Sequence, residues 1–468
     1  MGRWFVPGLL ALLAAGLGAL AVRPPSVPPL VPEDAASGVA APVLSVRRAP
    51  VALSRYVADA RLAARLDEVL ADPRLGEGRA RHCLVVRQDG RVVVERQPET
   101  VLVPASNLKL VTALAVLERL GPETRLETVV RAAHPARDGV IDGDLWMIGA
   151  GDPLLGTKDY ADSFVNQPQL RTPLEDLVAA VVAAGVREVR GSVRGDESRY
   201  DTQRFLPTWR RSYMSEGHVG PESALAVNDG FVTFRPRKVA TSEPATHAAS
   251  VFTDLLRASG VVVAGAPGQG TAPSGQVKVA SVLSAPLREV VAAMIRESDN
   301  NTAELLTKEL GRRFAREGST AAGLGVARDT LAAADLPVAD LTAVDGSGLD
   351  RSDRASCRLF AQVLAEDGPD GAIAAGLAVA GESGTLSQRF VGSPAVGRLR
   401  AKTGFLDGVV GLSGWIDALR GSDLLFSFMA NGLPVPTEQP AQHVQERLGA
   451  ALATYPEAPP PEELVPGA

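Results

Sequence analysis

Apolar residues recur with helical periodicity near both ends of this chain of 468 residues. Over residues 55–75 small or apolar side chains return every three or four positions, which predicts an amphipathic helix. The same spacing predicts a helix over residues 437–455. In residues 107–120 Leu or Val returns about every third position, which indicates a more deeply buried helix. Helical patterning is also long over residues 281–310 and recurs in segments up to residue 377.

Strands are predicted from a different pattern, short β-branched and apolar runs bounded by turn residues. Residues 82–88 and 91–97 are such runs, and Asp89-Gly90 between them is typical of a two-residue hairpin turn. Three further runs follow one another closely between Gly-containing turns and predict an antiparallel meander: 398–402, 409–416 and 424–430. Both ends of the chain therefore supply helices and strands to one sheet, and the predicted fold class is α+β.

The middle of the chain has a different pattern of predicted elements. Residues 126–277 contain short strands, turn-rich loops and one helix-like stretch, so we expect an inserted mixed domain there. Residues 51–125 and 278–456 then form the main domain around the sheet.

The two ends have the composition of export and tether segments. Residues 1–22 combine Arg3, an apolar stretch and Ala19-Leu20-Ala21, a string that suits a signal peptidase. They predict a signal peptide or, because the stretch is near the lower length limit of a spanning helix, an uncleaved membrane anchor. We expect a Pro-rich linker over residues 23–50, a disordered tail over 457–468, and an exported protein that acts outside the cytoplasm.

Composition excludes several classes of function. A net charge of -6 without any sustained basic run gives no support for nucleic-acid binding. The five histidines lack ligand spacing and no cysteine cluster occurs, so we expect neither a metal nor a cofactor. Cys83 lies in a strand-like run and Cys357 in a helix-like one. We expect two buried free thiols, although the sequence does not decide whether they pair. It also leaves the oligomeric state open.

Candidate chemistry begins with Ser106-Asn107-Leu108-Lys109. Residues three apart share a helix face, so Lys109 is expected one turn beneath Ser106 and within reach of its hydroxyl. A serine hydroxyl needs a neighbouring base in order to attack, and a neutral lysine can take that proton. Ser106 at a helix start also meets the positive end of the helix dipole, which favours a developing alkoxide. Ser106 is therefore the candidate nucleophile and Lys109 the candidate base.

Two later strings complete the set. In Ser298-Asp299-Asn300 we expect Ser298 to pass a proton between lysines to the leaving amine, and Asn300 to hold the substrate's acyl-side amide. Lys402-Thr403-Gly404 supplies a cation and a hydroxyl for a substrate carboxylate, and Gly404 leaves room for substrate along the strand edge. Backbone N–H groups of Ser106 and Phe405 are the expected oxyanion hole.

Lysine is scarce in this chain, which strengthens the assignment. Only six of the 48 basic residues are lysine, and two of those six, Lys109 and Lys402, fall in the strings. Arginine stays protonated in proteins and cannot serve as a base at position 109. Burial beside a second cation lowers the pKa of a lysine, and Lys402 is the candidate for that cation.

At these strings the chain resembles the type-4 low-molecular-mass penicillin-binding proteins, the D-alanyl-D-alanine carboxypeptidase/endopeptidase family. The resemblance covers nearly the whole chain after the leader and includes five further segments: 149–153, 195–201, 223–229, 345–349 and 380–386. It implies a penicillin-binding/serine β-lactamase-like transpeptidase fold with an insertion between the first two strings. It also implies cleavage of the terminal D-Ala-D-Ala bond of peptidoglycan stem peptides, and acylation by β-lactams.

The same resemblance implies that Ser347, Gly348 and Arg351 approach the active-site cleft, and that residues 213–218 overhang it. Phe405 departs from the family pattern, which has a small hydroxyl residue there that helps to bind the terminal carboxylate. A serine β-lactamase is one alternative, but a base that activates water in the class A context is not found. A non-catalytic cell-wall or β-lactam-sensing protein is another, and the intact strings argue against it. The balance of carboxypeptidase and endopeptidase action and the residue preceding D-Ala stay open.

Overall fold

The computed structural model describes residues 49–76, 81–421 and 423–464. The predicted leader and most of the predicted linker lie outside these residues. Within them, no helix combines the length and the apolar character needed to cross a membrane.

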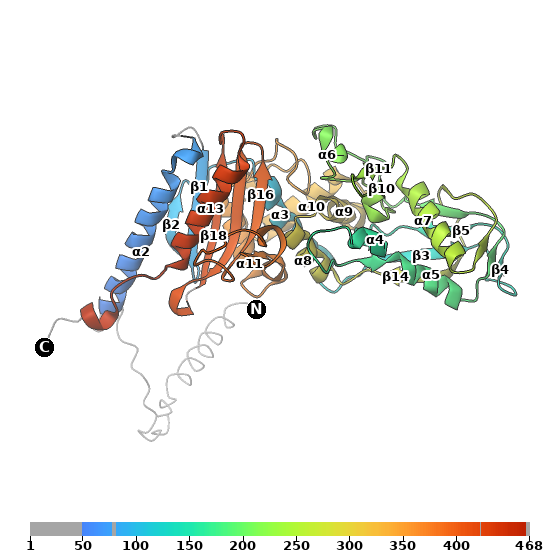
Figure 1. Ribbon diagram of the computed structural model, residues 1–468, viewed down its shortest axis with the longest axis horizontal. Helices are drawn as coiled ribbons and strands as arrows, with labels where there is room; N and C mark the ends of the chain where they lie inside the picture. The colour runs from blue at the N-terminus through green and yellow to red at the C-terminus, as the bar shows by residue number, and fades with distance from the viewer. Residues whose placement is uncertain (1–48, 77–80, 422, 465–468) are drawn as a thin grey trace, which may run out of the picture. The chain divides into compact units, whose positions relative to one another are not determined.

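The main domain is built on an antiparallel six-stranded sheet with the order β15-β16-β17-β18-β1-β2. Its strands come from both ends of the chain, and Figure 1 shows blue β1 beside orange-red β18. Their bounds are β1 Arg81–Gln88, β2 Arg91–Arg96, β15 Ala378–Val379, β16 Leu399–Leu406, β17 Val409–Asp417 and β18 Asp423–Asn431. The predicted hairpin and meander are both present, and β18 joins them by pairing with β1.

Helices cover both faces of this sheet because successive strand residues point in opposite directions. Leu84 and Val86 of β1 pack with α2 (Ala49–Leu70) and α13 (Glu438–Ala453) in one apolar core. Cys83 and Val85 face a second core. The helices of that core are α3 Lys109–Leu120, α8 Leu287–Glu297, α9 Asn300–Leu310, α10 Thr320–Ala333, α11 Cys357–Asp367 and α12 Ala372–Gly376.

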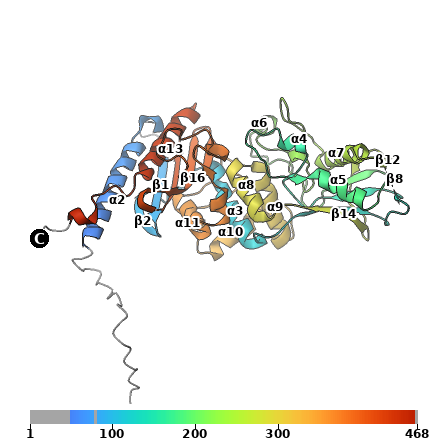
Figure 2. The ribbon, with the colours of Figure 1, turned by 60° about the horizontal axis from the view of Figure 1, so that its bottom comes forward.

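The insertion has its own five-stranded sheet, ordered β13-β9-β5-β3-β14. Helices α5 (Leu174–Ala183) and α7 (Pro244–Ala258) pack on it in a third core. Figure 2 shows α8 and α9 between this green insertion and the six-stranded sheet. The strands are β3 Glu127–Ala132, β5 Leu145–Ile148, β9 Val193–Asp196, β13 Gly268–Gln269 and β14 Val277–Leu283.

Smaller elements complete the insertion. A three-stranded sheet joins β4 Val140–Ile141, β8 Glu188–Val189 and β12 Val262–Val263, and two strand pairs join β6 Leu155–Gly156 with β7 Thr172–Pro173 and β10 Phe231–Thr233 with β11 Val239–Ala240. Its short helices are α4 Lys158–Ala161, α6 Ser212–Ser215 and the 3₁₀ turn η4 Asn228–Gly230. The main domain adds η2 Pro73–Leu75, η3 Ala105–Leu108, the π-helical η5 Gly311–Ala315, η6 Val338–Asp340, η7 Gly384–Leu386, η8 Leu419–Gly421 and η9 Pro461–Leu464.

Several boundaries differ from the sequence predictions, and β16 extends to Leu406 instead of ending at residue 402. Residues 281–283 were expected to begin a helix, but β14 extends through Leu283 and pairs with β3, so the insertion's sheet continues past residue 277. The first helix begins at Ala49 and ends at Leu70 rather than spanning residues 55–75. Part of the predicted disordered tail is ordered, since residues 461–464 form η9 and Ser54 Oγ donates to the carbonyl of Pro459.

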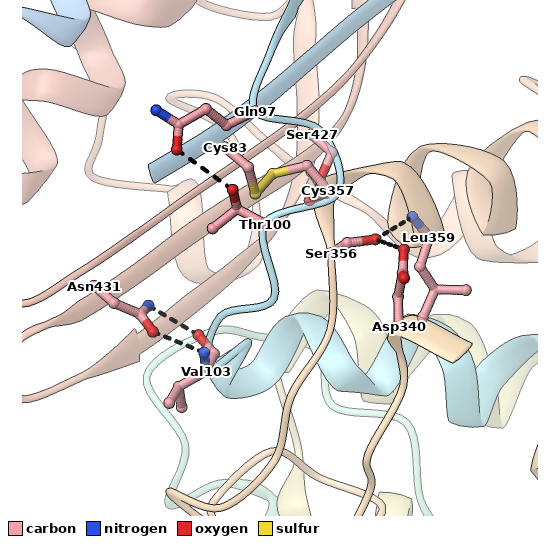
Figure 3. The surroundings of a disulfide bond; sticks show 11 residues. Cys83, Gln97, Thr100, Val103, Asp340, Ser356, Cys357, Leu359, Ser427 and Asn431 are labelled. Carbon is pink, nitrogen blue, oxygen red and sulfur yellow. Dashed lines mark hydrogen bonds between the residues drawn. A yellow bond between two sulfur atoms is a disulfide. The ribbon is translucent and has the colours of Figure 1, made fainter. Parts of the chain in front are cut away.

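The expectation of two free thiols is wrong, because Cys83 and Cys357 form a disulfide across 274 positions (Figure 3). Cys83 points from β1 toward the core that contains α11, and Ser356 caps α11 so that Cys357 is its first residue. Their Cα atoms are 5.8 Å apart, and both side chains are buried. Periodicity places each cysteine in its element correctly, but it carries no information on which elements pack together.

Candidate active site

Ser106 lies in a 3₁₀ turn that leads directly into the buried helix α3. The preceding Ala105 has a φ of 48°, in the left-handed region. Gly348 packs against this turn so closely that a Cβ on it would lie 1.9 Å from the carbonyl oxygen of Ala105. Glycine at 348 therefore allows the segment 345–349 to lie directly behind the serine.

Lys109, the first residue of α3, is fully buried and reaches three oxygen atoms. Its Nζ lies 3.1 Å from Ser106 Oγ, 2.6 Å from Asn300 Oδ1 and 2.7 Å from the carbonyl oxygen of Ser347. A neutral amine has two N–H bonds and one lone pair. The amide and carbonyl oxygens can accept both N–H groups, which leaves the lone pair for the hydroxyl proton of Ser106.

Burial lowers the pKa of Lys109 from its ordinary value to about 8, against the opposing charges of Asp345 and Glu304. The sequence predicted that burial beside a second cation, Lys402, lowers the pKa of Lys109. The burial of Lys109 is present, but the effect of the neighbouring charge falls on the other lysine: burial, and then the charge of Lys109, hold the pKa of Lys402 well below its ordinary value. Desolvation in the core is thus the main reason that both lysines are poised to lose a proton.

Ser298 and Lys402 form the second half of the site. Ser298 ends α8 with a φ of 59°, an uncommon conformation for a residue other than glycine. Lys402 Nζ, buried on β16, donates to Ser298 Oγ at 2.8 Å and to the carbonyl oxygen of Thr403 at 2.7 Å. The left-handed turn therefore brings a hydroxyl from the helical layer to a lysine of the sheet.

Asn300 begins α9, and Asp299 is the N-cap of this helix, accepting from the backbone N–H of Thr302. Both polar atoms of the Asn300 side chain make hydrogen bonds. Its Oδ1 accepts from Lys109, and its Nδ2 donates to the carbonyl oxygen of His218 at 2.7 Å. The amide nitrogen of Asn300 carries a second N–H group, which can donate to a substrate amide while the contact with His218 is kept.

Ser106, Ser298 and Asn300 border a cleft of about 550 Å³. Thr403, Gly404 and Phe405 line it from β16, whose pairing with β15 involves only Arg400 and Ala401. Among the described residues no strand pairs with this side of β16 beyond that point, so its edge is open to an extended peptide. A Cβ on Gly404 would lie 2.8 Å from the carbonyl oxygen of Pro104, which explains glycine there.

The remaining residues that were predicted to bind substrate differ in how they lie relative to the cleft. Ser347 is buried and offers its backbone carbonyl to Lys109, and Gly348 packs behind Ser106. Arg351 does not line the cleft; its Nη1 donates to the carbonyl oxygen of Asp407, which does. The insertion contributes Tyr213, Glu216 and His218 from the predicted overhanging segment.

Sequence reasoning missed several cleft residues: Arg210, Leu349, Thr385, Arg389 and Asp407. Leu349 and Thr385 fall inside segments that the resemblance had singled out, which was the one available signal. Arg210 and Asp407 form an ion pair at 2.8 Å between the insertion and the turn after β16, a pairing that periodicity does not reveal.

The open sheet edge, the buried helix and the two serine–lysine pairs define a serine enzyme of the penicillin-binding/serine β-lactamase-like fold. The chain belongs to the D-Ala-D-Ala carboxypeptidase 3 (S13) family, whose sequence profile matches residues 62–238 and 233–454. It is a serine-type D-Ala-D-Ala carboxypeptidase. The predicted α+β fold class and the family resemblance are confirmed.

Relatives of known name agree with this assignment. The chain is 30% identical to a D-alanyl-D-alanine carboxypeptidase of Actinomadura sp. (strain R39), over 83% of this chain and 84% of that one. It is 31% identical to a carboxypeptidase of Mycobacterium tuberculosis, over 88% and 86%. Its fold matches penicillin-binding protein 4 of Haemophilus influenzae with a TM-score of 0.70 at 19% identity, over 83% and 99% of the chains, and that protein has also been solved with a bound β-lactam.

Proposed function

We propose that Ser106 Oγ attacks the carbonyl carbon of the penultimate D-Ala in a peptidoglycan stem peptide and forms an ester with it. The C–N bond to the terminal D-Ala breaks, and that D-Ala leaves as the free amino acid. Water then hydrolyses the ester and regenerates the serine. The observation that carries this proposal is the 3.1 Å contact between Ser106 Oγ and the buried amine of Lys109.

Lys109 is the base in this scheme. Its pKa of about 8 leaves part of the enzyme with a neutral amine near neutral pH. As the serine attacks, Lys109 takes the hydroxyl proton while its other two contacts hold the amine in place. Lys402 donates a hydrogen bond to Ser298 Oγ. Through this contact the two residues return a proton to the amine of the departing D-Ala.

The negative charge of the tetrahedral intermediate is stabilised by the backbone N–H groups of Ser106 and Phe405. The peptide lies along the open edge of β16, where Gly404 admits its backbone. The Thr403 hydroxyl and, when it carries a proton, the amine of Lys402 lie beside the terminal carboxylate. Because these contacts use backbone atoms and residues 402–404, the phenyl group of Phe405 does not remove them.

The same serine is the site of acylation by β-lactams, whose reactive amide occupies the position of the scissile peptide. Membership of the D-Ala-D-Ala carboxypeptidase family supports action on the cell wall. The export pattern of residues 1–22 supports action outside the cytoplasm. β-Lactam antibiotics are thus covalent inhibitors, and we expect the acyl-enzyme that they form to be hydrolysed slowly.

The test uses wild-type protein and Ser106→Ala with two substrates. A labelled penicillin reports acylation, and a stem peptide ending in D-Ala-D-Ala reports release of D-Ala. Wild type is expected to do both and Ser106→Ala neither, with thermal unfolding as the check that the variant folds. D-Ala release by folded Ser106→Ala refutes the role of Ser106, and rapid turnover of penicillin with little D-Ala release indicates a β-lactamase instead.

A further inference from the structure

One loop of the main domain brings an unassigned hydroxyl to the cleft. Thr385 lies in η7, within the segment 380–386, and lines the cleft together with Thr403. The Thr403 hydroxyl donates to Thr385 Oγ1 at 2.9 Å. In the described part of the chain, the hydroxyl proton of Thr385 itself meets no acceptor. Thr385 therefore presents a spare hydrogen-bond donor at the wall of the cleft.

The loop holds Thr385 in this position firmly. Gly384 has a φ of 53°, and a Cβ on it would lie 2.4 Å from the carbonyl oxygen of Arg296. Only glycine therefore lets the loop approach the end of α8, immediately before Ser298. Ser383 Oγ accepts from the backbone N–H of Val379 at 3.0 Å, and Leu386 is fully buried. The residues on both sides of Thr385 are anchored.

An arginine side chain lines the same cleft as Thr385. The guanidinium of this residue, Arg389, contacts the carbonyl oxygen of Gln442 and lies 3.8 Å from Glu446. Phe405, the next side chain along the open edge of β16, is 45% exposed and has no donor. Hydroxyl donors and a nearby arginine are groups that bind carboxylates well.

We propose that Thr385 is a further substrate-binding residue, which donates a hydrogen bond to the C-terminal carboxylate of the substrate beside Thr403. It supplies the side-chain hydroxyl that position 405 lacks in this chain. This inference rests on the proposed function, because it requires the terminal D-Ala to lie next to Thr403. The C-terminal carboxylate thereby accepts a hydrogen bond from Thr385 of the loop that contains η7, and the Thr385 hydroxyl in turn accepts from Thr403 of strand β16.

The test compares two peptides that differ at one end, a stem peptide with a free D-Ala-D-Ala carboxylate and the same peptide as its C-terminal carboxamide. Thr385→Val keeps the shape of the side chain and removes the hydroxyl. A hydrogen bond to a charged group is lost, so kcat/KM for the carboxylate peptide is expected to fall about 10- to 100-fold. For the carboxamide we expect a change of less than about twofold, because a neutral group gains less from the donor.

Three variants make the result decisive. Thr385→Ser retains the hydroxyl and is expected to recover most of the activity lost in Thr385→Val. Ser387→Ala removes a hydroxyl from the same loop away from the cleft and is the matched control. Phe405→Thr, added to Thr385→Val, is expected to restore part of kcat/KM for the carboxylate peptide alone.

Equal losses on the two peptides, or no loss on either, overturn the role of Thr385. Failure of the proposed function is recognised by a different result, which is D-Ala release by folded Ser106→Ala. That measurement does not involve the Thr385 variants.

Discussion

Lys109 Nζ lies 2.6 Å from Asn300 Oδ1, although 191 positions separate the two residues in the chain. This contact joins the helix behind the candidate nucleophile to α9, the second helix after the insertion. Further along α9, buried Lys308 contacts Asp201 at 2.6 Å and Glu222 at 3.0 Å, both in the insertion. One helix therefore connects the candidate base with the segment that supplies His218 to the cleft.

The first prediction concerns the identity of the base. Lys109→Arg keeps a positive charge but removes a group that can become neutral. We expect acylation of Ser106 by labelled penicillin to fall by about 10²- to 10⁴-fold, the usual contribution of a general base. Thermal unfolding is measured alongside, and a folded Lys109→Arg protein that is acylated at the wild-type rate rules out Lys109 as the base.

The second prediction is a pH dependence. Only neutral Lys109 accepts a proton, and its pKa of about 8 means that the neutral fraction is about a tenth at pH 7 and rises through pH 8. The acylation rate of wild-type enzyme should therefore rise with pH between about 6 and 9, with a midpoint near 8. Stopped-flow acylation with a penicillin across this range tests it. A rate that is flat or falls with rising pH contradicts this protonation state.

The third prediction concerns the link between α9 and the insertion. Lys308→Met leaves the buried carboxylate of Glu222 without its cation, and the loss of one partner of a buried pair typically costs about 3–5 kcal/mol. Chemical unfolding should show a free energy of unfolding lower by about this amount. The matched control is Lys158→Met, whose exposed pair with Asp162 is worth less than about 1 kcal/mol. Equal effects of the two substitutions refute a structural role for the buried pair.

The fourth prediction concerns the disulfide. Cys83 and Cys357 close a loop of 274 positions, so the bond restricts the unfolded chain strongly. In the chain-entropy model its loss costs up to about 5–6 kcal/mol, with engineered cases often giving less. We expect Cys83→Ala/Cys357→Ala to unfold at a clearly lower temperature while penicillin acylation persists at low temperature. A melting temperature unchanged by the double substitution shows that the bond adds no stability.

Much of the fold could be predicted from the sequence because its elements have strong local patterns. The alternation around Asp89-Gly90 and the runs between residues 398 and 430 identify the sheet strands, since each strand has one face in either core. The limits appear where a contact joins distant segments. Neither the pairing of Cys83 with Cys357 nor that of β14 with β3 leaves a periodic signal in the sequence.

The candidate site shows the same division. The spacing of Ser106 and Lys109 on consecutive helical turns makes their contact predictable. The contact between Asn300 and His218 depends on how the insertion packs on α9, and Thr385 reaches Thr403 only through the left-handed turn at Gly384. Phe405, which departs from the family pattern, thus lines the same cleft as Thr385, whose position only the structure reveals.

Acylation of Ser106 is the step on which the proposed reaction depends. It is tested by treating the wild-type protein with a penicillin, digesting it and locating the added mass by tandem mass spectrometry. We expect one adduct per chain on the peptide that contains Ser106, at the serine itself. An adduct on Ser298 or on any other residue, with Ser106 unmodified, contradicts it.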